Sequence, residues 1–136
     1  MELEKSYPYV AKTRRCKYNK SKGVVKATKH HGVRKNVKAL TSAIAKGPTC
    51  VAVDADNNYF QGYTGGILNN CGKSANLDHA ITAVGYGTEN GVTYAIVRNS
   101  WTASWGEQGY IRMALNAQGS QGVCGILLDP TTVKTA

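Results

Sequence analysis

The chain has 136 residues, of which 42% are hydrophobic and 18% are charged, a composition that fits one soluble globular domain. No apolar run approaches the roughly 18 residues that a membrane-spanning helix needs. The net charge of +9 is concentrated in residues 1–50, which contain 13 basic and two acidic residues. Because these bases are scattered singly and accompany no zinc or stacking-aromatic motif, we expect a solvated basic surface and no nucleic-acid partner.

The first half of the chain contains one clear helix signal. The residues around Pro8 indicate an extended or turn segment, since a residue before proline avoids the helical region. A strand is expected over 23–33. Asn36 is suited to cap a helix over 37–45, whose apolar residues recur every three or four positions, and Gly47-Pro48 ends that helix.

The second half is typical of β-structure. Residues 49–55 alternate in polarity and predict a strand, and the aromatic and glycine-rich residues 59–68 predict a turn of helix and a loop. The runs 79–86 and 92–98 predict a hairpin through Asn90-Gly91, a strong turn signal.

Two further strands are expected, over 109–115 and 122–128. One helix followed by four or five antiparallel strands predicts an α+β domain that closes toward a small barrel.

The four cysteines, at positions 16, 50, 71 and 124, form no C-x-x-C motif, which disfavours zinc ribbons and thioredoxin-type redox sites. Widely spaced cysteines in a small glycine-rich chain indicate disulfides and an oxidising compartment. The glycosylation sequon Asn19-Lys20-Ser21 agrees with a secretory route. Met1 opens a polar stretch with no signal-peptide core, so we expect any targeting information to lie outside this chain.

The pair His30-His31, together with Cys16, offers three side chains of types that bind metals. The spacing of these three residues matches no metal-binding pattern, and a solvated turn is the better interpretation. We therefore expect neither a metal nor another cofactor.

His79 opens one strand of the predicted hairpin, and Asn99 ends the other. Neighbouring strands lie about 4.8 Å apart, so the two side chains are within reach of a hydrogen bond. An imidazole held by an amide is a general-base arrangement, because one ring nitrogen is fixed and the other is free for a proton. Taken alone, the pair is a weak signal, and a structural histidine is the better interpretation.

The residues around this pair carry a resemblance. The strings Leu-Asp-His-Ala at 77–80, Val-Gly-Tyr-Gly at 84–87, Asn-Ser-Trp at 99–101 and Trp-Gly-Glu-Gln-Gly-Tyr at 105–110 closely resemble those of papain-like cysteine peptidases. The similarity extends from the Tyr-Pro-Tyr at 7–9 to Gly-Val-Cys-Gly at 122–125, and so spans nearly the whole chain.

The resemblance implies roles for six residues. His79 resembles the catalytic histidine of the family and Asn99 its orienting asparagine. Trp101 resembles the indole that covers their hydrogen bond, and Trp105 a second tryptophan near the leaving-group side of the cleft. Cys71 and Cys124 resemble the two halves of a family disulfide.

The resemblance also implies a fold and its boundaries. Residues 23–136 are similar to the C-terminal, antiparallel β-barrel-like domain of the papain-like proteinase fold, with one main helix. Residues 1–22 are similar to the segment that connects it to an N-terminal helical domain. Cys16 matches a structural disulfide whose partner would lie in that missing domain.

The family's nucleophilic cysteine lies near the mature N-terminus, about 130–150 residues before the histidine, which counts back beyond Met1. Cys16 and Cys50 lack its flanking residues. We therefore expect a cysteine-type endopeptidase domain that supplies the histidine and asparagine, while a missing N-terminal domain or a second chain supplies the thiol. The alternative is a non-catalytic, degenerate peptidase domain that serves as a binding or structural subunit. An anion-binding protein that uses the basic half is a weaker, third hypothesis.

Three positions depart from the family pattern, and one of them is Ala95, which stands where an aromatic residue is common. Thr102 stands where the family has glycine after Asn-Ser-Trp, so the local geometry there is in doubt. Cys50 replaces a small or aliphatic strand residue and is expected to be a buried, unpaired thiol.

Further residues resemble the pocket for the second residue before the scissile bond: Ala52, Leu77, Asp78, Ala80 and, at its floor, Asp129. Small and aliphatic walls favour an apolar substrate side chain, and the carboxylate of Asp129 suits a basic one. A solvated Asp129 that precedes a turn is the alternative.

The resemblance implies a peptide or protein substrate, and it allows an inhibitor or propeptide as a further partner. It implies passage through the secretory route to a lysosomal, vacuolar or extracellular location.

Overall fold

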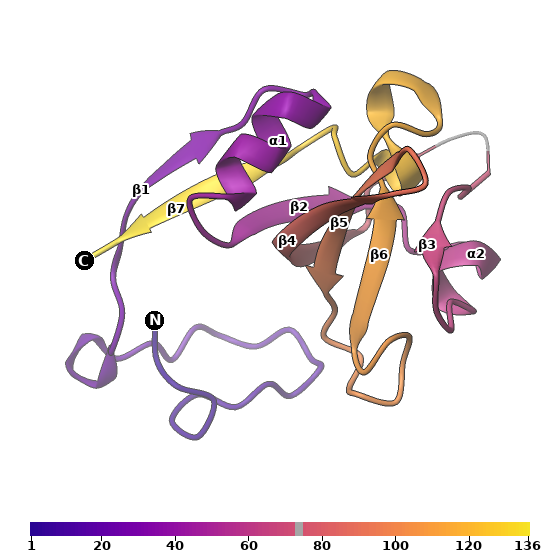
Figure 1. The fold of residues 1–136 in the computed structure, drawn as a ribbon. Helices are drawn as coiled ribbons and strands as arrows, with labels where there is room; N and C mark the ends of the chain where they lie inside the picture. The colour runs from indigo at the N-terminus through magenta and orange to yellow at the C-terminus, as the bar shows by residue number, and fades with distance from the viewer. Residues whose placement is uncertain (73–74) are drawn as a thin grey trace. The chain divides into compact units, whose positions relative to one another are not determined.

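The computed structural model describes residues 1–72 and 75–136 (Figure 1). The chain forms two compact units: residues 31–132 make up one, and residues 1–30 together with 133–136 make up the other. The boundary that the sequence suggested between residues 22 and 23 stays a prediction.

The unit that contains the N-terminus is mostly irregular. A single turn of 3-10 helix, Lys20–Lys22, interrupts the long loop, and the expected strand over 23–33 is shorter and begins at Ala27. In the C-terminal part of this unit, Lys134 O accepts a hydrogen bond from Thr28 Oγ1 at 3.0 Å.

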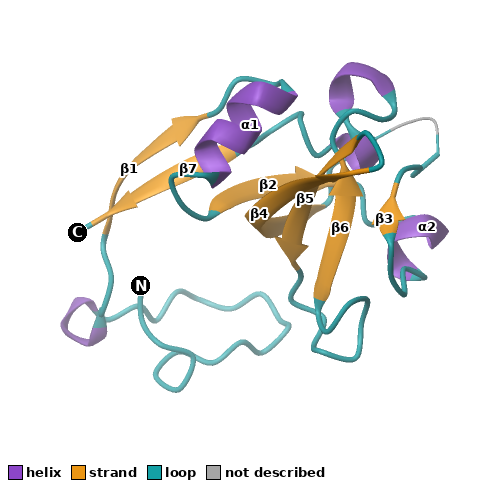
Figure 2. Ribbon diagram, in the orientation of Figure 1, coloured by secondary structure: helices purple, strands orange, loops and turns teal. Residues whose placement is uncertain are grey.

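One mixed sheet of seven strands organises the described part of the chain, in the order β1-β7-β2-β4-β5-β6-β3 (Figure 2). The strands β3 and β6 run parallel and the other described pairs run antiparallel. The sheet is open, with β1 and β3 at its edges, so the α+β class is confirmed but the barrel-like closure and the wholly antiparallel pairing are not found. The strands are β1 (Ala27–Gly32), β2 (Thr49–Val53), β3 (Ile67–Leu68), β4 (His79–Glu89), β5 (Val92–Arg98), β6 (Tyr110–Ala114) and β7 (Thr131–Thr135).

The predicted hairpin is confirmed as β4 and β5. Its turn is made by Asn90 and Gly91, which have φ values of 49° and 78°, and Glu89 pairs with Val92 across it. Two successive residues in the left-handed region twist the chain in the sense that antiparallel strands need. A register shift between Ala83 and Gly85 marks a bulge in β4.

The predicted helix is α1 (Val37–Ile44), and Asn36 caps it as expected, with its Oδ1 accepting from Ala39 N at 2.8 Å. The helix buries Leu40 and Ile44 and packs against β4. A second helix of one turn, α2 (Asn58–Gln61), fulfils the expectation of a helical turn within 59–68.

The strand expected over 122–128 is wrong. Gly122, Cys124 and Gly125 have φ values of 68°, 53° and 75°, which lie in the left-handed region and are incompatible with a strand. The segment forms short 3-10 turns instead, Gly119–Gln121 and Val123–Gly125, which place Cys124 against Cys71.

The disulfide that the resemblance implied joins Cys71 to Cys124, across a sequence separation of 53 residues. Closing a loop of this size restricts the unfolded chain and contributes about 2–4 kcal/mol to stability. It also ties the turn at 122–125 to the region that follows β3.

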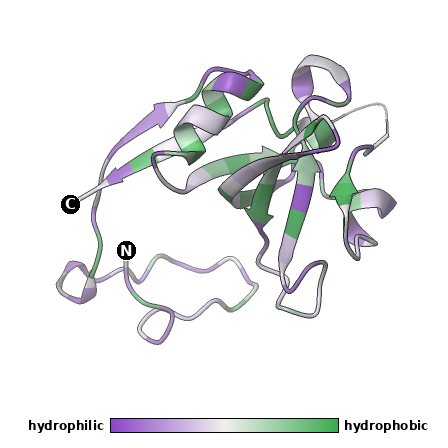
Figure 3. Ribbon diagram, in the orientation of Figure 1, coloured by the Kyte–Doolittle hydropathy of each residue, from purple (hydrophilic) through white to green (hydrophobic). Residues whose placement is uncertain are grey.

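The core lies on one face of the central strands, and hydrophobic residues recur along β5 and β6 (Figure 3). In β2 the side chains alternate, with Val51 and Val53 buried and Cys50 exposed on the other face. The expectation of a buried Cys50 is therefore wrong, because the period of two along the strand directs it away from the core. No helix among the described residues is long and apolar enough to cross a membrane.

Candidate active site

His79 and Asn99 meet at the open end of the β4–β5 hairpin. His79 is the first residue of β4 and Asn99 follows the last residue of β5. The ring Nε2 of His79 lies 2.9 Å from Asn99 Oδ1. The amide is 8% exposed and the imidazole is half-buried. The two side chains that the sequence placed on adjoining strands are thus hydrogen-bonded to each other.

The neighbouring backbone orients the Asn99 amide. The N–H of Ser100, which can only donate, points at Asn99 Oδ1 over 2.7 Å. The same oxygen faces His79, so the ring Nε2 must donate and carry a proton. In the neutral ring, Nδ1 is therefore the unprotonated nitrogen.

The other end of the same amide has no partner. Asn99 Nδ2 is a buried side-chain nitrogen without a hydrogen bond in the described part of the chain. An unsatisfied buried donor costs about 1–3 kcal/mol. Among the described residues, the oxygen end of the Asn99 amide is therefore the end held by hydrogen bonds.

An aromatic cluster surrounds the imidazole. The ring of Trp101 stacks on that of His79 with a centroid distance of 5.1 Å and an interplanar angle of 27°. Phe60, which is fully buried, meets Trp101 edge-on at 5.5 Å and His79 at 6.2 Å. These rings cover part of the imidazole and strengthen the hydrogen bond beside it, while Trp101 itself stays 36% exposed.

Trp105, in the loop between β5 and β6, links the cluster to α2. Its ring centroid lies 5.2 Å from that of Phe60 and 5.4 Å from that of Trp101. Its Nε1 donates to Gln61 O at 3.2 Å. The loop that contains both tryptophans is thereby fastened to the short helix.

A charged clamp holds the end of the same loop. Arg112, on β6, donates from Nη2 to Glu107 Oε1 at 2.8 Å and from Nε to Glu107 Oε2 at 3.0 Å. Glu107 Oε1 also accepts from Gly66 N at 2.9 Å. The bonds from Arg112 lower the pKa of Glu107, and the carboxylate raises the pKa of Arg112. Burial raises the pKa of the nearby Tyr63.

The family model of papain family cysteine proteases matches residues 1–133. The chain belongs to that family. Most of its length takes part in the match, so the papain-family assignment applies to both compact units.

Curated relatives agree with the papain-family assignment. The chain is 45% identical over 132 residues to a probable cysteine protease, RD21B, of Arabidopsis thaliana, covering 95% of this chain and 28% of the relative. It is 43% identical over 130 residues to fruit bromelain of Ananas comosus, covering 93% of this chain and 36% of that protein. The chain thus spans well under half the length of these relatives.

Solved structures share the fold. Bromelain from Ananas comosus, in complex with the E64 inhibitor, matches with a TM-score of 0.85 and 42% identity over 98% of this chain and 62% of that chain. The Carica candamarcensis cysteine protease CMS1MS2 matches with a TM-score of 0.82 and 37% identity, covering 98% and 61%. The predicted papain-like fold is therefore confirmed.

The five expected substrate-pocket residues do not share one face. Ala52 and Ala80 are paired across β2 and β4 and lie on the face opposite the core. His79 pairs with Val53 and points to the core side. Residues directly opposite each other point the same way, which places the two alanines and the imidazole on different sides of the sheet.

The other three pocket candidates have different surroundings. Leu77 and Leu128 both flank Gly125, where an added Cβ would lie 2.9 Å and 3.1 Å from their methyl carbons. Asp129, which follows Leu128, is exposed. Asp78 is not free, because its two carboxylate oxygens accept from the backbone N–H groups of Ala55 and Asp56. Their roles in substrate binding stay predictions.

Several site residues were not anticipated from the sequence. Phe60 is the only phenylalanine of the chain, and its place among aromatic and glycine residues was the one available signal. The Ser100 N–H and the Glu107–Arg112 clamp depend on backbone geometry and on the pairing of β6, which no local pattern shows.

Thr102 occupies a strained position beside the site. Its φ is 70°, which a β-branched residue rarely adopts. Its Oγ1 lies 2.8 Å from Ser104 Oγ. An open hollow of about 460 Å³, lined by residues of the segment 98–110, lies beside Asn99 and Thr102. The local geometry at Thr102, which the departure from the family pattern left open, is a left-handed backbone conformation.

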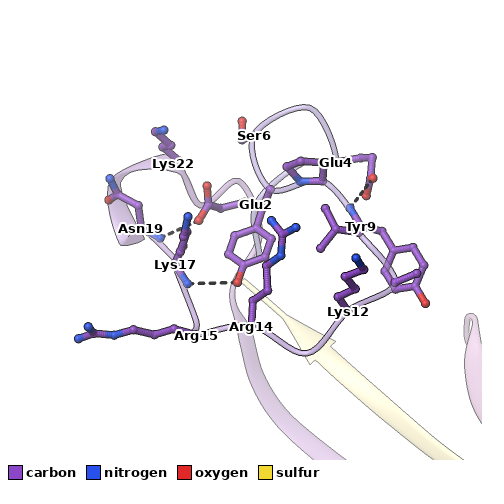
Figure 4. A pocket seen from close by; sticks show the side chains of 14 residues that line it. Glu2, Glu4, Ser6, Tyr9, Lys12, Arg14, Arg15, Lys17, Asn19 and Lys22 are labelled. Carbon is purple, nitrogen blue, oxygen red and sulfur yellow. Dashed lines mark hydrogen bonds between the residues drawn. The ribbon is translucent and has the colours of Figure 1, made fainter.

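A second hollow, of about 740 Å³, lies within the loop of residues 1–22 (Figure 4). Five basic side chains line it, and its two acids are engaged by backbone N–H groups: Glu2 by Asn19 and Glu4 by Tyr9. The basic side chains are exposed, which confirms the expected solvated basic surface. Among the described residues, no group of three or more metal-ligating side chains occurs, at His30-His31 or elsewhere.

Replacing Thr102 with glycine is expected to raise the free energy of unfolding by about 0.5–1 kcal/mol. Glycine at positive φ relieves a strain of about 1–2 kcal/mol. Part of this gain is lost because glycine has more conformational entropy in the unfolded chain. Urea unfolding measures the difference. Thr102→Ala is the matched control, since it keeps the Cβ and should bring no gain; a glycine variant less stable than the parent would contradict the strain argument.

Replacing Glu107 with glutamine is expected to lower the free energy of unfolding by about 1 kcal/mol at neutral pH. The expected loss is this small because the Glu107–Arg112 pair is partly exposed to solvent. The pKa of Glu107 is lowered in the folded state, so its ionised form stabilises the fold above the unfolded pKa. This contribution is lost as the pH falls through the lowered pKa.

Urea unfolding of parent and variant should therefore converge in acid. Glu89→Gln is the control, because Glu89 contacts Arg112 with one oxygen and its side chain is 55% exposed. A stability difference that persists at acid pH would show that the clamp does not act through the charge of Glu107.

Proposed function

We propose that this chain supplies the imidazole base and its orienting amide for a cysteine peptidase. The observation that supports this most directly is the 2.9 Å contact between His79 Nε2 and Asn99 Oδ1, with the amide oriented by Ser100 N–H. A base whose protonated nitrogen is fixed presents its other nitrogen, Nδ1, to a reacting group. Membership of the papain family supports the same assignment.

The source of the thiol is the next question, and the structure argues against Cys50. Cys50 pairs with Thr82, three positions along β2 from the pairing of Val53 with His79. Three residues of strand extend about 10 Å, and Cys50 lies on the opposite face of the sheet. Cys71 and Cys124 are joined to each other. We propose that the nucleophile belongs to polypeptide outside these 136 residues, which cover only part of each relative.

In the proposed reaction, the thiol transfers its proton to His79 Nδ1 and the resulting thiolate attacks the carbonyl carbon of the peptide. The carbon–nitrogen bond breaks as His79 returns the proton to the leaving amine, which leaves a thioester. His79 then takes a proton from water, whose oxygen attacks the thioester and releases the acid and the thiol. Asn99 keeps the ring oriented throughout, and Trp101 shields their hydrogen bond.

The proposed location follows from the disulfide. Structural disulfides form in oxidising compartments, and Cys71–Cys124 therefore supports passage through the secretory route. A lysosomal, vacuolar or extracellular destination belongs to the same proposal.

A chimera tests the assignment. The part of fruit bromelain that precedes the matched region is joined to residues 1–136, and hydrolysis of a peptide substrate is measured. His79→Ala is expected to lower kcat by about 10²–10⁴-fold, the range that general acid–base groups contribute. Asn99→Ala should cause a smaller loss, because it removes only the orienting partner.

Cys50→Ser, at an exposed free cysteine, is the matched control and should leave kcat unchanged. An unaltered kcat in the His79→Ala chimera would refute the proposal. A chimera that folds and keeps a free thiol without turning over substrate would favour a non-catalytic, degenerate domain, to which the strained Thr102 beside the indole lends support.

Specificity is the second part of the proposal. Asp129 is exposed and follows Leu128, which lies near Leu77 at Gly125. We propose that its carboxylate accepts a basic side chain at the second residue before the scissile bond, while Leu77 suits an apolar one.

In the active chimera, Asp129→Ala is expected to lower kcat/KM for an arginine substrate by roughly fivefold to tenfold relative to a leucine substrate, as the loss of a charge-assisted pair would. Paired substrates that differ only at that residue measure the ratio. Asp56→Ala, at another exposed aspartate, serves as control. An unchanged ratio after Asp129→Ala removes the role of this carboxylate.

A further inference from the structure

We infer that Asn19 is a site of N-linked glycosylation, which takes an oligosaccharide from a lipid-linked diphosphate donor. Asn19-Lys20-Ser21 is the only Asn-x-Ser/Thr tripeptide in the sequence. This inference is independent of the proposed peptidase activity. It depends only on entry of the chain into an oxidising lumen, which the Cys71–Cys124 disulfide indicates.

The local geometry prepares the amide. Asn19 Oδ1 accepts from Ser21 N at 3.0 Å and from Ser21 Oγ at 2.8 Å. Two donors on the carbonyl oxygen withdraw electron density from the amide, so the Nδ2 protons become more acidic. Within residues 1–72 and 75–136, no other group bonds to Asn19 Nδ2. The nitrogen that must form the new bond is therefore free and activated by its own tripeptide.

The arrangement forms without the rest of the fold. Both bonds span only two residues, and Asn19 has extended backbone angles of φ −117° and ψ 114° at the start of a single 3-10 turn. An Asx turn of this kind is stabilised locally. The tripeptide can thus adopt its acceptor conformation while the chain enters the lumen, before the sheet is complete.

The folded unit also has space for the product. Asn19, Lys20 and Ser21 are all exposed. Figure 4 shows the Asn19 side chain at one edge of the hollow that the loop encloses, where it is one of the lining residues. An attached glycan would displace no packed atom, and it would cover part of an exposed surface that is rich in bases and tyrosines.

The modification balances as a single transfer. The Nδ2 of Asn19 forms a bond to the anomeric carbon of the first sugar, and the bond from that carbon to the diphosphate oxygen breaks. Nδ2 loses one proton, and the lipid diphosphate leaves with the electron pair of the broken bond. The donor is the lipid-linked oligosaccharide named above, and no oxidation is involved.

The test is translation of the full chain, with a cleavable signal peptide, in the presence of rough microsomes. Protease-protected chain is scored for a glycan-sized increase in mass that peptide-N-glycosidase removes, leaving aspartate at position 19. Asn19→Gln and Ser21→Ala should abolish the glycosylated form. Ser21→Thr, which keeps the hydroxyl, and Asn58→Gln, at an exposed asparagine outside the motif, should retain it.

Protected, disulfide-bonded chain whose peptide containing Asn19 is unmodified would overturn the inference. So would a glycan that persists in Asn19→Gln. Loss of the peptidase activity in the chimera has no bearing on either outcome, because the readout is the mass of the peptide.

Discussion

The orientation of one buried amide is the constraint on which the site depends. Asn99 has two chemically different ends, and the adjacent Ser100 N–H, which is a donor, can bond only to the oxygen. That single backbone donor decides which end faces His79, and hence which ring nitrogen is protonated.

The surrounding structure keeps that amide and imidazole in place from several directions. The β4–β5 hairpin sets the separation of the two residues. A hydrogen bond from Asn99 N to Gly109 O, at 2.9 Å, closes the loop between β5 and β6. Phe60 from α2 and the two tryptophans fill the space behind the ring. The Glu107–Arg112 clamp fixes the far end of the loop to the sheet. Rigid elements thus position a polar pair that loops alone would leave mobile.

The two compact units have different physical character. Residues 31–132 contain the buried core, the disulfide and the candidate active site. The long basic loop that precedes β1 has almost entirely exposed side chains and is organised by local turns and by acids bonded to backbone N–H groups. Surface of this kind suits solvation and modification, whereas catalytic geometry requires the packed unit.

The sequence by itself determined the features whose causes are local or repeat along the chain. The Asn36 cap, the Asn90-Gly91 turn and the alternating strands each follow from contacts within a few residues. The family strings around His79 and Asn99 identified the candidate pair and the cysteine partners. Only the tertiary structure decided that 122–128 turns rather than extends, that Cys50 faces outward and that Phe60 lies behind the imidazole. Those outcomes depend on which strands pair and on which face of each strand is buried, and contacts between residues far apart in the sequence decide both.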